Sequence, residues 1–336
     1  MSGRSFEVFP KAAIAVDPVH VGTGGARLGR VDNTIVRDPV TRVPKIPGSS
    51  LAGVLRSYVA MQEETGRDES SRPKPYYPDC AGQGQPRQDG SGGHCGQPDC
   101  RVCTVFGFAR GGRGGFAGLA SFSDAHVLLF PVATREGPLW VTAPSALRLL
   151  DGLRDQEDVA ENKLYRNGSS DQPLNLGWLL LPVQKYCKMS TITDKLKNMH
   201  IPEYIRNRMG IVSDKLFSHV VNSNLEVRTS VAIDPATGAA EEGLLFTYEA
   251  LPRGTVVLWE ITCRNPAHCR IGKNEVAVRC PADVHQVVTG GFPYLEALGI
   301  GGMGSRGMGR LRVLNPDGKV SGASQCNVSK ASQGDP

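Results

Sequence analysis

The sequence predicts an α+β fold of ferredoxin or RRM type that is interrupted by long insertions. Three observations lead to this prediction. The predicted elements follow the order strand, helix, strands, helix, strands, helix, strand. The regular strand–helix alternation of a doubly wound sheet is missing. The chain of 336 residues with 40% hydrophobic residues is long enough for one large domain with insertions.

The predicted elements begin with a strand at 6–16 and a helix at 51–64, whose apolar residues recur at helical spacing. Ser49 or Ser50 is the expected N-cap of this helix. Residues 157–176 are polar and predict a loop. The other expected elements are strands at 119–133 and 139–144, helices at 144–156 and near 202–209, a hairpin of 224–233 and 242–251 around a turn at 234–238, strands at 254–263 and 275–280, a helix at 293–300 and a strand at 309–315.

The composition narrows the compartment and the class of partner. The net charge of +5 is compatible with a nucleic-acid partner but also with an ordinary enzyme. The N-terminus lacks the apolar core of a signal peptide, and no segment has the roughly 18 consecutive apolar residues of a membrane span. We therefore expect a cytoplasmic protein with no membrane partner, in which the nine cysteines are thiols or metal ligands.

Residues 65–116 are rich in Gly, Pro, Asp, Gln and Cys and cannot build an apolar core of their own. Zinc prefers four Cys or His ligands in a tetrahedron, and a bound metal substitutes for a core. The segment therefore predicts a structural zinc site, with unrelated free thiols as the alternative. Five candidates compete for four positions, with His94 or Cys80 as the variable member: Cys80, His94, Cys95, Cys100 and Cys103.

The glycine-rich run from Gly299 to Arg310 matches the dinucleotide pattern G-x-G-x-x-G at 302–307. A dinucleotide site needs a strand before the glycines and a helix after them, whereas here a helix precedes and a strand follows. Two interpretations stay open, a flexible turn and a loop whose backbone N–H groups approach a phosphate chain. In the second interpretation, the RNA contacts are Gly302, Gly304, Arg306 and Arg310.

The segment VDNTIVRDPVTRVPKIPGSSLAGVLRS at 31–57 is long and specific. It resembles the RAMP superfamily, specifically the backbone subunit of type III CRISPR effector complexes. The resemblance continues through 100–107, 118–132, 137–147, 241–257 and 301–310. The N-terminal third is more similar to the Csm type and the middle to the Cmr type, so the subtype (III-A, III-B or III-D) stays open.

The resemblance implies a single RRM-like RAMP domain over 1–318, with a zinc-knuckle insertion at 65–116, a thumb region at 155–250 and a disordered tail at 319–336. It implies that copies of the subunit stack along a guide RNA together with other type III effector subunits. It also implies that each copy cleaves the target RNA at regular intervals through Asp32, with a divalent metal that we expect to be Mg²⁺.

The residues around Asp32 agree with this role. A carboxylate can bind Mg²⁺ or position a 2′-OH, and the neighbouring Arg30 and Arg37 can neutralise a phosphate. An Asx-turn is the alternative for Asp32, and Asp38 is expected to form a turn. The further candidate RNA contacts are His20, which is otherwise a satisfied loop histidine, and Arg37, Lys45, Ser49, Ser50 and Arg56.

Two other functions remain possible from the sequence. One is a non-catalytic structural subunit of the same complex. The other is a zinc-containing metabolic enzyme whose glycine loop binds a nucleotide.

Overall fold

A computed structural model describes residues 4–24, 31–70, 74–82, 93–109, 114–155 and 157–317, except for the side chains of 241–244. The predicted disordered tail at 319–336 lies outside the described residues. Within these residues, no helix is long and apolar enough to cross a membrane.

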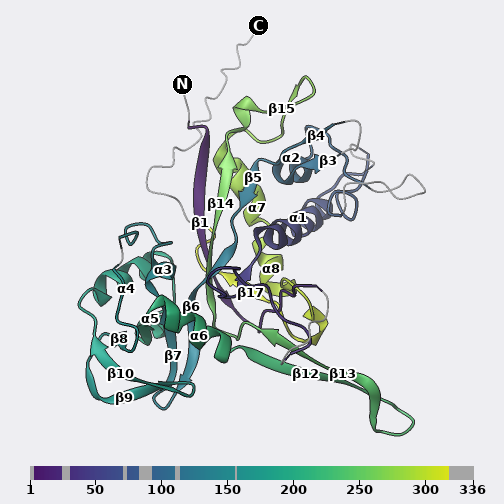
Figure 1. Cartoon of the computed structure of the whole chain (residues 1–336). Helices are drawn as coiled ribbons and strands as arrows, with labels where there is room; N and C mark the ends of the chain where they lie inside the picture. The colour runs from purple at the N-terminus through teal and green to yellow at the C-terminus, as the bar shows by residue number, and fades with distance from the viewer. Residues whose placement is uncertain are drawn as a thin grey trace.

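A four-stranded antiparallel layer forms the centre of the molecule (Figure 1). Its long central pair runs in register from Phe6 opposite Arg264 to Ile14 opposite Val256. The strand order is β17 (Leu311–Val313), β1 (Phe6–Ala15), β14 (Val256–Arg264) and β6 (Ala125–Thr134). Two short strands add to this layer, β2 (Lys45–Ile46) on β6 and β5 (Ala120–Phe122) on β14.

Alternate residues of β1 point into two different cores. Phe9 and Ala13 pack in a core with apolar residues of α1 (Gly48–Thr65), α7 (Pro281–Thr289) and α8 (Phe292–Leu298). Ala12 and Ile14 pack on the opposite side with α3 (Pro144–Leu147), α4 (Met189–Asn198) and α5 (Glu203–Arg206). The period of two along a strand therefore places one helical layer on each face of the sheet.

The start of α1 differs from the prediction. The helix begins at Gly48, so Ser49 and Ser50 lie in its first turn and neither is the N-cap. The carboxylate of Asp124 instead accepts a hydrogen bond from the Gly48 N–H at 2.8 Å. Gly48 is needed because a Cβ at this position would lie 2.4 Å from the carbonyl oxygen of Phe122. A residue 76 positions away thus caps the helix, which local sequence rules do not predict.

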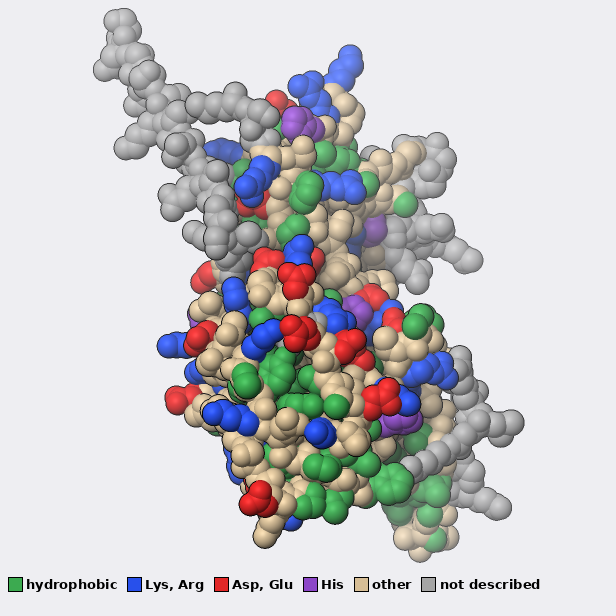
Figure 2. Space-filling view, turned by 60° about the vertical axis from the view of Figure 1, so that its left-hand side comes forward, with side chains coloured by type: hydrophobic (Ala, Val, Ile, Leu, Met, Phe, Trp, Pro, Cys, Tyr) green, Lys and Arg blue, Asp and Glu red, His purple; other side chains and the backbone are tan. Residues whose placement is uncertain are grey.

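The sheet continues beyond β6 as a mixed sheet, because β7 pairs in parallel with β11 and β8 pairs in parallel with β10. The strands follow in the order β7 (Gly137–Thr142), β11 (Met209–Ile211), β8 (Leu164–Arg166), β10 (Leu179–Lys185) and β9 (Ser170–Leu176). On the face shown in Figure 2, basic and acidic side chains are interspersed rather than separated.

Several predicted elements in this half of the chain are wrong. The expected loop at 157–176 contains β8 and β9, and the expected helix at 144–156 ends at Leu147. The expected strand at 275–280 is reduced to β16 (Asn274–Glu275), which pairs with β15 (Arg270–Ile271). The helices α4, α6 (Asp214–Ser223) and α7 were not predicted.

The predicted hairpin is confirmed. Strands β12 (Glu226–Ile233) and β13 (Ala240–Ala250) pair antiparallel and project away from the sheet (Figure 1). The insertion contains α2 (Arg101–Phe106) and the short pair β3 (Phe108–Ala109) and β4 (Gly115–Phe116). Apolar residues of α2 pack against Val59 and Ala60 of α1.

Candidate functional site: the Asp32 loop, the hairpin base and the cysteine cluster

The loop that carries Asp32 lies along the base of the hairpin. The N–H of Asn33 donates to the carbonyl of Thr247 at 3.0 Å, and the N–H of Glu249 donates to the carbonyl of Asn33 at 3.0 Å. These two bonds give the loop a strand-like pairing with β13. The loop therefore has a fixed position relative to the hairpin.

The side chain of Asp32 is exposed but oriented. Its Oδ2 accepts hydrogen bonds from the backbone N–H of Thr247 at 2.7 Å and from the Thr247 hydroxyl at 2.9 Å. These two donors, the backbone N–H first, hold the pKa of Asp32 below its usual range. Asp32 therefore presents an ionised carboxylate at the junction of loop and hairpin.

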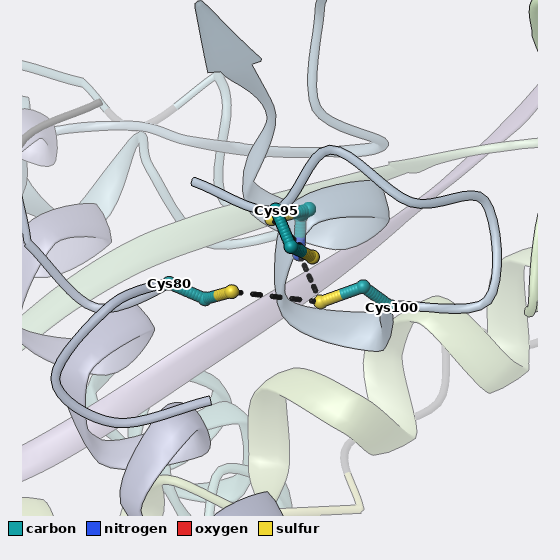
Figure 3. Close-up of side chains that lie close together, drawn as sticks. Cys80, Cys95 and Cys100 are labelled. Atoms are coloured by element: carbon teal, nitrogen blue, oxygen red, sulfur yellow. Dashed lines mark hydrogen bonds between the residues drawn. The ribbon is translucent and has the colours of Figure 1, made fainter. Parts of the chain in front are cut away.

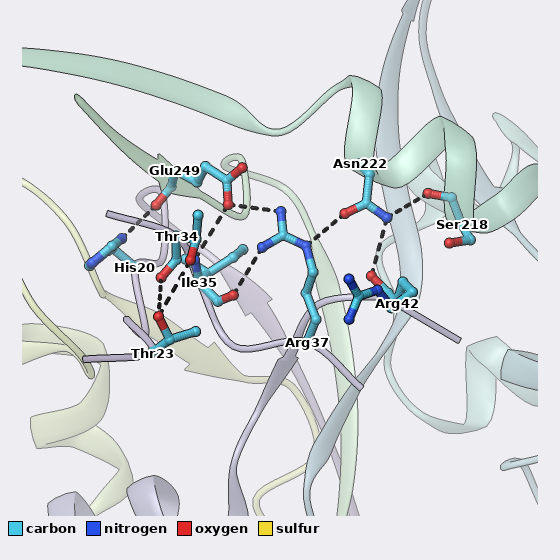
Figure 4. Close-up of polar contacts among 9 residues, drawn as sticks. All are labelled: His20, Thr23, Thr34, Ile35, Arg37, Arg42, Ser218, Asn222 and Glu249. Carbon is cyan, nitrogen blue, oxygen red and sulfur yellow. Dashed lines mark hydrogen bonds and ion pairs between the residues drawn. The ribbon is translucent and has the colours of Figure 1, made fainter. Parts of the chain in front are cut away.

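Arg37 connects this loop to α6 (Figure 4). Its guanidinium forms an ion pair with Glu249 at 2.8 Å and donates to Asn222 Oδ1 at 2.8 Å and to the Ile35 carbonyl at 3.0 Å. These internal partners give Arg37 a structural role in fixing the loop. Its predicted contact with RNA stays a prediction.

His20 connects the same hairpin to the glycine loop. Its Nδ1 lies 2.6 Å from the carbonyl oxygen of Glu249, and its own carbonyl accepts from the Gly302 N–H at 2.9 Å. The side chain is buried, so the interpretation of a satisfied loop histidine fits its position. An RNA contact of His20 is not tested by this geometry.

The glycine loop is a well-defined turn beside the hairpin base. Gly301 has a φ of +88°, and a Cβ there would lie 2.2 Å from the His20 carbonyl oxygen. Arg306 donates to Ser230 Oγ at 2.8 Å and lies over the ring of Phe246, with 5.6 Å from Cζ to the ring centroid. Two loops distant in sequence thus flank the hairpin base, one with Asp32 and one with Gly302, Gly304 and Arg306.

The other predicted cations have internal partners as well. Arg310 forms an ion pair with Asp17. Lys45 forms an ion pair with Asp124 at 2.6 Å, beside the first turn of α1 where Ser49 is exposed. Asp38 accepts from the N–H groups of Val40 and Thr41, so its predicted turn role is confirmed.

Arg56 lies where the sequence did not predict it. The side chain is buried on α1, with 9% of its surface exposed, rather than lying at the surface in contact with solvent or with an RNA strand. Its guanidinium donates to the carbonyls of Cys80 at 2.6 Å and Gly107 at 2.7 Å. Burial lowers the pKa of Arg56, and the cysteines around it act in the opposite direction. We do not include Arg56 in the candidate RNA surface.

Four buried cysteines converge beneath Arg56. The sulfurs of Cys80, Cys95, Cys100 and Cys103 all lie within 4.8 Å of one another. The sulfurs of Cys95 and Cys103 lie 3.7 Å apart. Those of Cys80 and Cys100 lie 3.9 Å apart (Figure 3). Four ligands at a Zn–S distance of about 2.3 Å lie about 3.8 Å apart in a tetrahedron, whereas a disulfide is about 2.0 Å long. The spacing fits a structural zinc ion.

His94 is not part of this group. Its Nε2 lies 2.8 Å from the Gly82 carbonyl oxygen, and its buried Nδ1 has no hydrogen-bond partner among the described residues. Of the five predicted candidates, the structure brings together the four cysteines, and Cys80 is one of them.

The described residues offer only a partial site for Mg²⁺. The four-cysteine cluster is the one group of three or more candidate ligands found among them, so Asp32 belongs to no such group there. Mg²⁺ is commonly held by one or two carboxylates together with substrate phosphates and water. Asp32 fits such a site only if the RNA completes it.

Sequence reasoning missed the partners that orient the site. Thr247, Glu249 and Asn222 hold Asp32 and Arg37, and they lie 185 to 215 residues away in sequence. The Thr–Tyr–Glu sequence at 247–249 is an ordinary strand pattern. A contact over such a sequence separation leaves no local signal.

The chain is similar in sequence to one family model and to CRISPR endoribonucleases. The family model of the RAMP superfamily matches residues 13–312. The CRISPR system Cmr endoribonuclease Cmr4 of Pyrococcus furiosus is 26% identical over 256 residues, which cover 71% of this chain and 76% of the relative. The CRISPR system Cms endoribonuclease Csm3 of Methanothermobacter thermautotrophicus is 32% identical over 93 residues, which cover 27% of this chain and 29% of the relative.

Solved structures show the same fold at low identity. The oligomeric Cmr4 crystal structure from Pyrococcus furiosus has a TM-score of 0.57 at 19% identity and covers 92% of this chain and 98% of its own. A subunit chain of the type III-B Cmr-beta complex bound to cognate target RNA has a TM-score of 0.57 at 16% identity, with 93% and 99% covered.

Proposed function

The chain belongs to the RAMP superfamily, and we propose that it is the guide-RNA-binding backbone subunit of a type III CRISPR complex that cleaves complementary target RNA at regular intervals through Asp32. Its relatives named Cmr4 and Csm3 are described as endoribonucleases of CRISPR systems. The observation that carries the proposal is the exposed, ionised carboxylate of Asp32, which Thr247 fixes at the base of the hairpin.

The chemistry proposed for Asp32 is positioning of the nucleophile. In RNA cleavage the 2′-oxygen attacks the adjacent phosphorus, and the bond from phosphorus to the 5′-oxygen breaks. A carboxylate that accepts a hydrogen bond from the 2′-OH orients this attack. Since Oδ2 is engaged by Thr247, Oδ1 is the oxygen that faces the substrate. A bound Mg²⁺ would supply charge neutralisation at the phosphate.

The RNA path is proposed to run beside the hairpin base. In this proposal the glycine loop with Gly302 and Gly304 lets the RNA backbone approach closely, and Arg306 and Arg310 add positive charge. His20, Arg37 and Lys45, together with the α1 start at Ser49 and Ser50, complete the proposed contacts. Sequence would be read by base pairing with the guide rather than by the protein.

The parts of the chain are assigned accordingly. We propose that residues 1–318 form one RAMP domain whose sheet is the palm, and that the hairpin of β12 and β13 is the thumb within 155–250. The insertion at 65–116 is the zinc knuckle. Copies of the chain are proposed to stack along the guide RNA with other subunits of the complex, as the oligomeric relative suggests.

The test is cleavage of a complementary target RNA by the reconstituted guide complex. Asp32→Ala is compared with wild type and with Asp38→Ala, which removes a carboxylate from the same loop. We expect evenly spaced fragments from wild type and Asp38→Ala, and bound but intact target with Asp32→Ala. Cleavage in the presence of EDTA tests whether the reaction requires a divalent metal. If wild type binds target without cutting it, the chain is the non-catalytic structural subunit, and equal cutting by Asp32→Ala assigns the chemistry to another residue.

A further inference from the structure

A solvent-exposed tryptophan lies on a turn that is separate from the loop with Asp32. Trp178 is 86% exposed, whereas the other two tryptophans of the chain, Trp140 and Trp259, are buried. It lies at the turn between β9 and β10, next to Gly177, whose φ is +63°. An exposed indole offers a flat aromatic face on which a nucleic-acid base can stack.

The turn is held rigidly. The N–H of Gly177 donates to the Ala133 carbonyl at 3.0 Å, and its own carbonyl accepts from Asn175 at 2.8 Å. A Cβ at Gly177 would lie 2.4 Å from Asn224 Oδ1, at the end of α6. The indole therefore projects from a defined position on the surface.

A polar cavity lies beside the indole. It has a volume of about 630 Å³, and Arg42, Trp178, Ser218, His219, Asn222 and Ser223 line it. A smaller apolar cavity of about 220 Å³ also adjoins Trp178 and His219. Neither lining contains an acidic residue. The surface thus combines an aromatic platform, a guanidinium, an imidazole and neutral hydrogen-bonding groups.

Arg42 is held at this cavity by its backbone. Its φ is +61°, its N–H donates to the Asp38 carbonyl at 3.0 Å, and its carbonyl accepts from Asn222 Nδ2 at 3.1 Å. Its guanidinium makes no hydrogen bond or ion pair within the part of the chain that the structure describes. Unlike Arg37, Lys45 and Arg310, which are paired with carboxylates, Arg42 has a guanidinium that is available for a ligand.

We propose that this surface binds one nucleotide of single-stranded RNA, with the base stacked on Trp178 and a phosphate at Arg42. Single-strand sites combine positive charge with aromatic platforms, and stacking of one base contributes about 1–3 kcal/mol. The absence of carboxylates from the cavity lining favours an anionic ligand. The inference rests on the proposed function, because it takes RNA as the partner.

The site is coupled to the catalytic loop through one side chain. Asn222 accepts from Arg37 and donates to the carbonyl of Arg42 (Figure 4). Arg37 in turn pairs with Glu249, which lies two residues after Thr247, the partner of Asp32. The Arg42 side of the site is therefore connected through Asn222 and Arg37 to the loop that presents Asp32.

Intrinsic fluorescence tests the proposal because Trp178 is the exposed tryptophan. A single-stranded RNA decamer is added to the full chain carrying Asp32→Ala, and RNA anisotropy measures binding in parallel. We expect the long-wavelength emission to be quenched as the RNA binds. Trp178→Ala should weaken binding at least about fivefold, and Arg42→Ala should weaken it and reduce its salt dependence. Leu180→Ala, an exposed apolar residue of β10, is the matched control and should bind normally.

Three outcomes would overturn the proposal. If RNA binds without quenching Trp178, the proposed nucleotide site is wrong and the proposed function is unaffected. Failure of any RNA to bind contradicts both this site and the proposed function. An emission change that follows protein concentration without RNA identifies the surface as a contact between copies of the chain.

Discussion

Replacing Arg56 by methionine should destabilise the insertion and weaken zinc binding at its four-cysteine cluster, which fits a zinc ion. The guanidinium donates to the buried carbonyls of Cys80 and Gly107, and its third contact is Cys103 Sγ at 4.0 Å. A hydrogen bond to a charged group contributes about 1.5–3 kcal/mol. Arg56→Met, which keeps the aliphatic volume, should therefore lower the free energy of unfolding by about 3–6 kcal/mol.

The charge of the cluster adds to this effect. Four thiolates around one Zn²⁺ carry a net charge of −2, and Arg56 is the cation buried against them. Its removal should also speed zinc loss to a chromophoric chelator. Arg56→Lys, which keeps the charge but lacks the forked donors, should fall between wild type and Arg56→Met.

Urea unfolding followed by circular dichroism, together with zinc release, measures both effects. Arg270→Met, which removes an exposed arginine from β15, is the matched control and should stay within about 0.5 kcal/mol of wild type. Unchanged unfolding and unchanged zinc release in Arg56→Met would refute the reasoning.

Three more outcomes follow from the contacts or the burial of single residues. Thr247→Val removes the hydroxyl that holds Asp32 and should slow target cleavage about fivefold with unchanged RNA binding, while Thr247→Ser restores the rate; a Val variant at the wild-type rate would contradict this. Burial lowers the pKa of His285 to about 3. Below about pH 6.5 the unfolded chain therefore binds a proton that the folded chain does not bind. The free energy of unfolding should fall by up to about 1.4 kcal/mol per pH unit between pH 6.5 and 3. The free energy of unfolding, measured against pH, should fall less in acid for His285→Phe than for wild type. Parallel curves would show that His285 does not cause the loss of stability in acid. Gly301→Ala places a Cβ against the His20 carbonyl at positive φ and should lower the thermal midpoint by several degrees, equivalent to about 1–3 kcal/mol; an unchanged midpoint would mean that the loop relaxes freely.

The parts of the fold that were predictable are those with strong local signals. The buried positions of α1 repeat at helical spacing, and the turn residues at 234–238 mark the hairpin. The spacing of cysteines at 95, 100 and 103 likewise indicates the cluster. These features depend on neighbours in sequence, which is why pattern rules find them.

The second half of the sheet was harder to predict for a physical reason. Strand β9 contains Pro173 and several polar residues, and β10 contains Pro182 where the register shifts between Leu181 and Val183. Proline and polar residues argue against a strand by propensity, and pairing with neighbouring strands overrides it. Helix α4 did carry a signal, because Met189, Ile192 and Leu196 share one face.

The candidate site was predictable in its residue types but not in its connections. Asp32 and the glycine loop came from the sequence, whereas the tether to Thr247 joins residues 215 positions apart. The burial of Arg56 depends on the insertion folding back over α1, which local spacing does not encode. Tertiary contacts therefore decide which predicted cations are free to contact a ligand.

The most direct measurement of the central claim is cleavage by guide complexes assembled from mixtures of wild-type and Asp32→Ala chains. Each chain is proposed to make one cut, so cutting at each position should decrease in proportion to the wild-type fraction while the positions of the cuts stay constant. Cleavage that stays at full strength in complexes assembled from Asp32→Ala alone would contradict the account, because the cut would then not depend on Asp32.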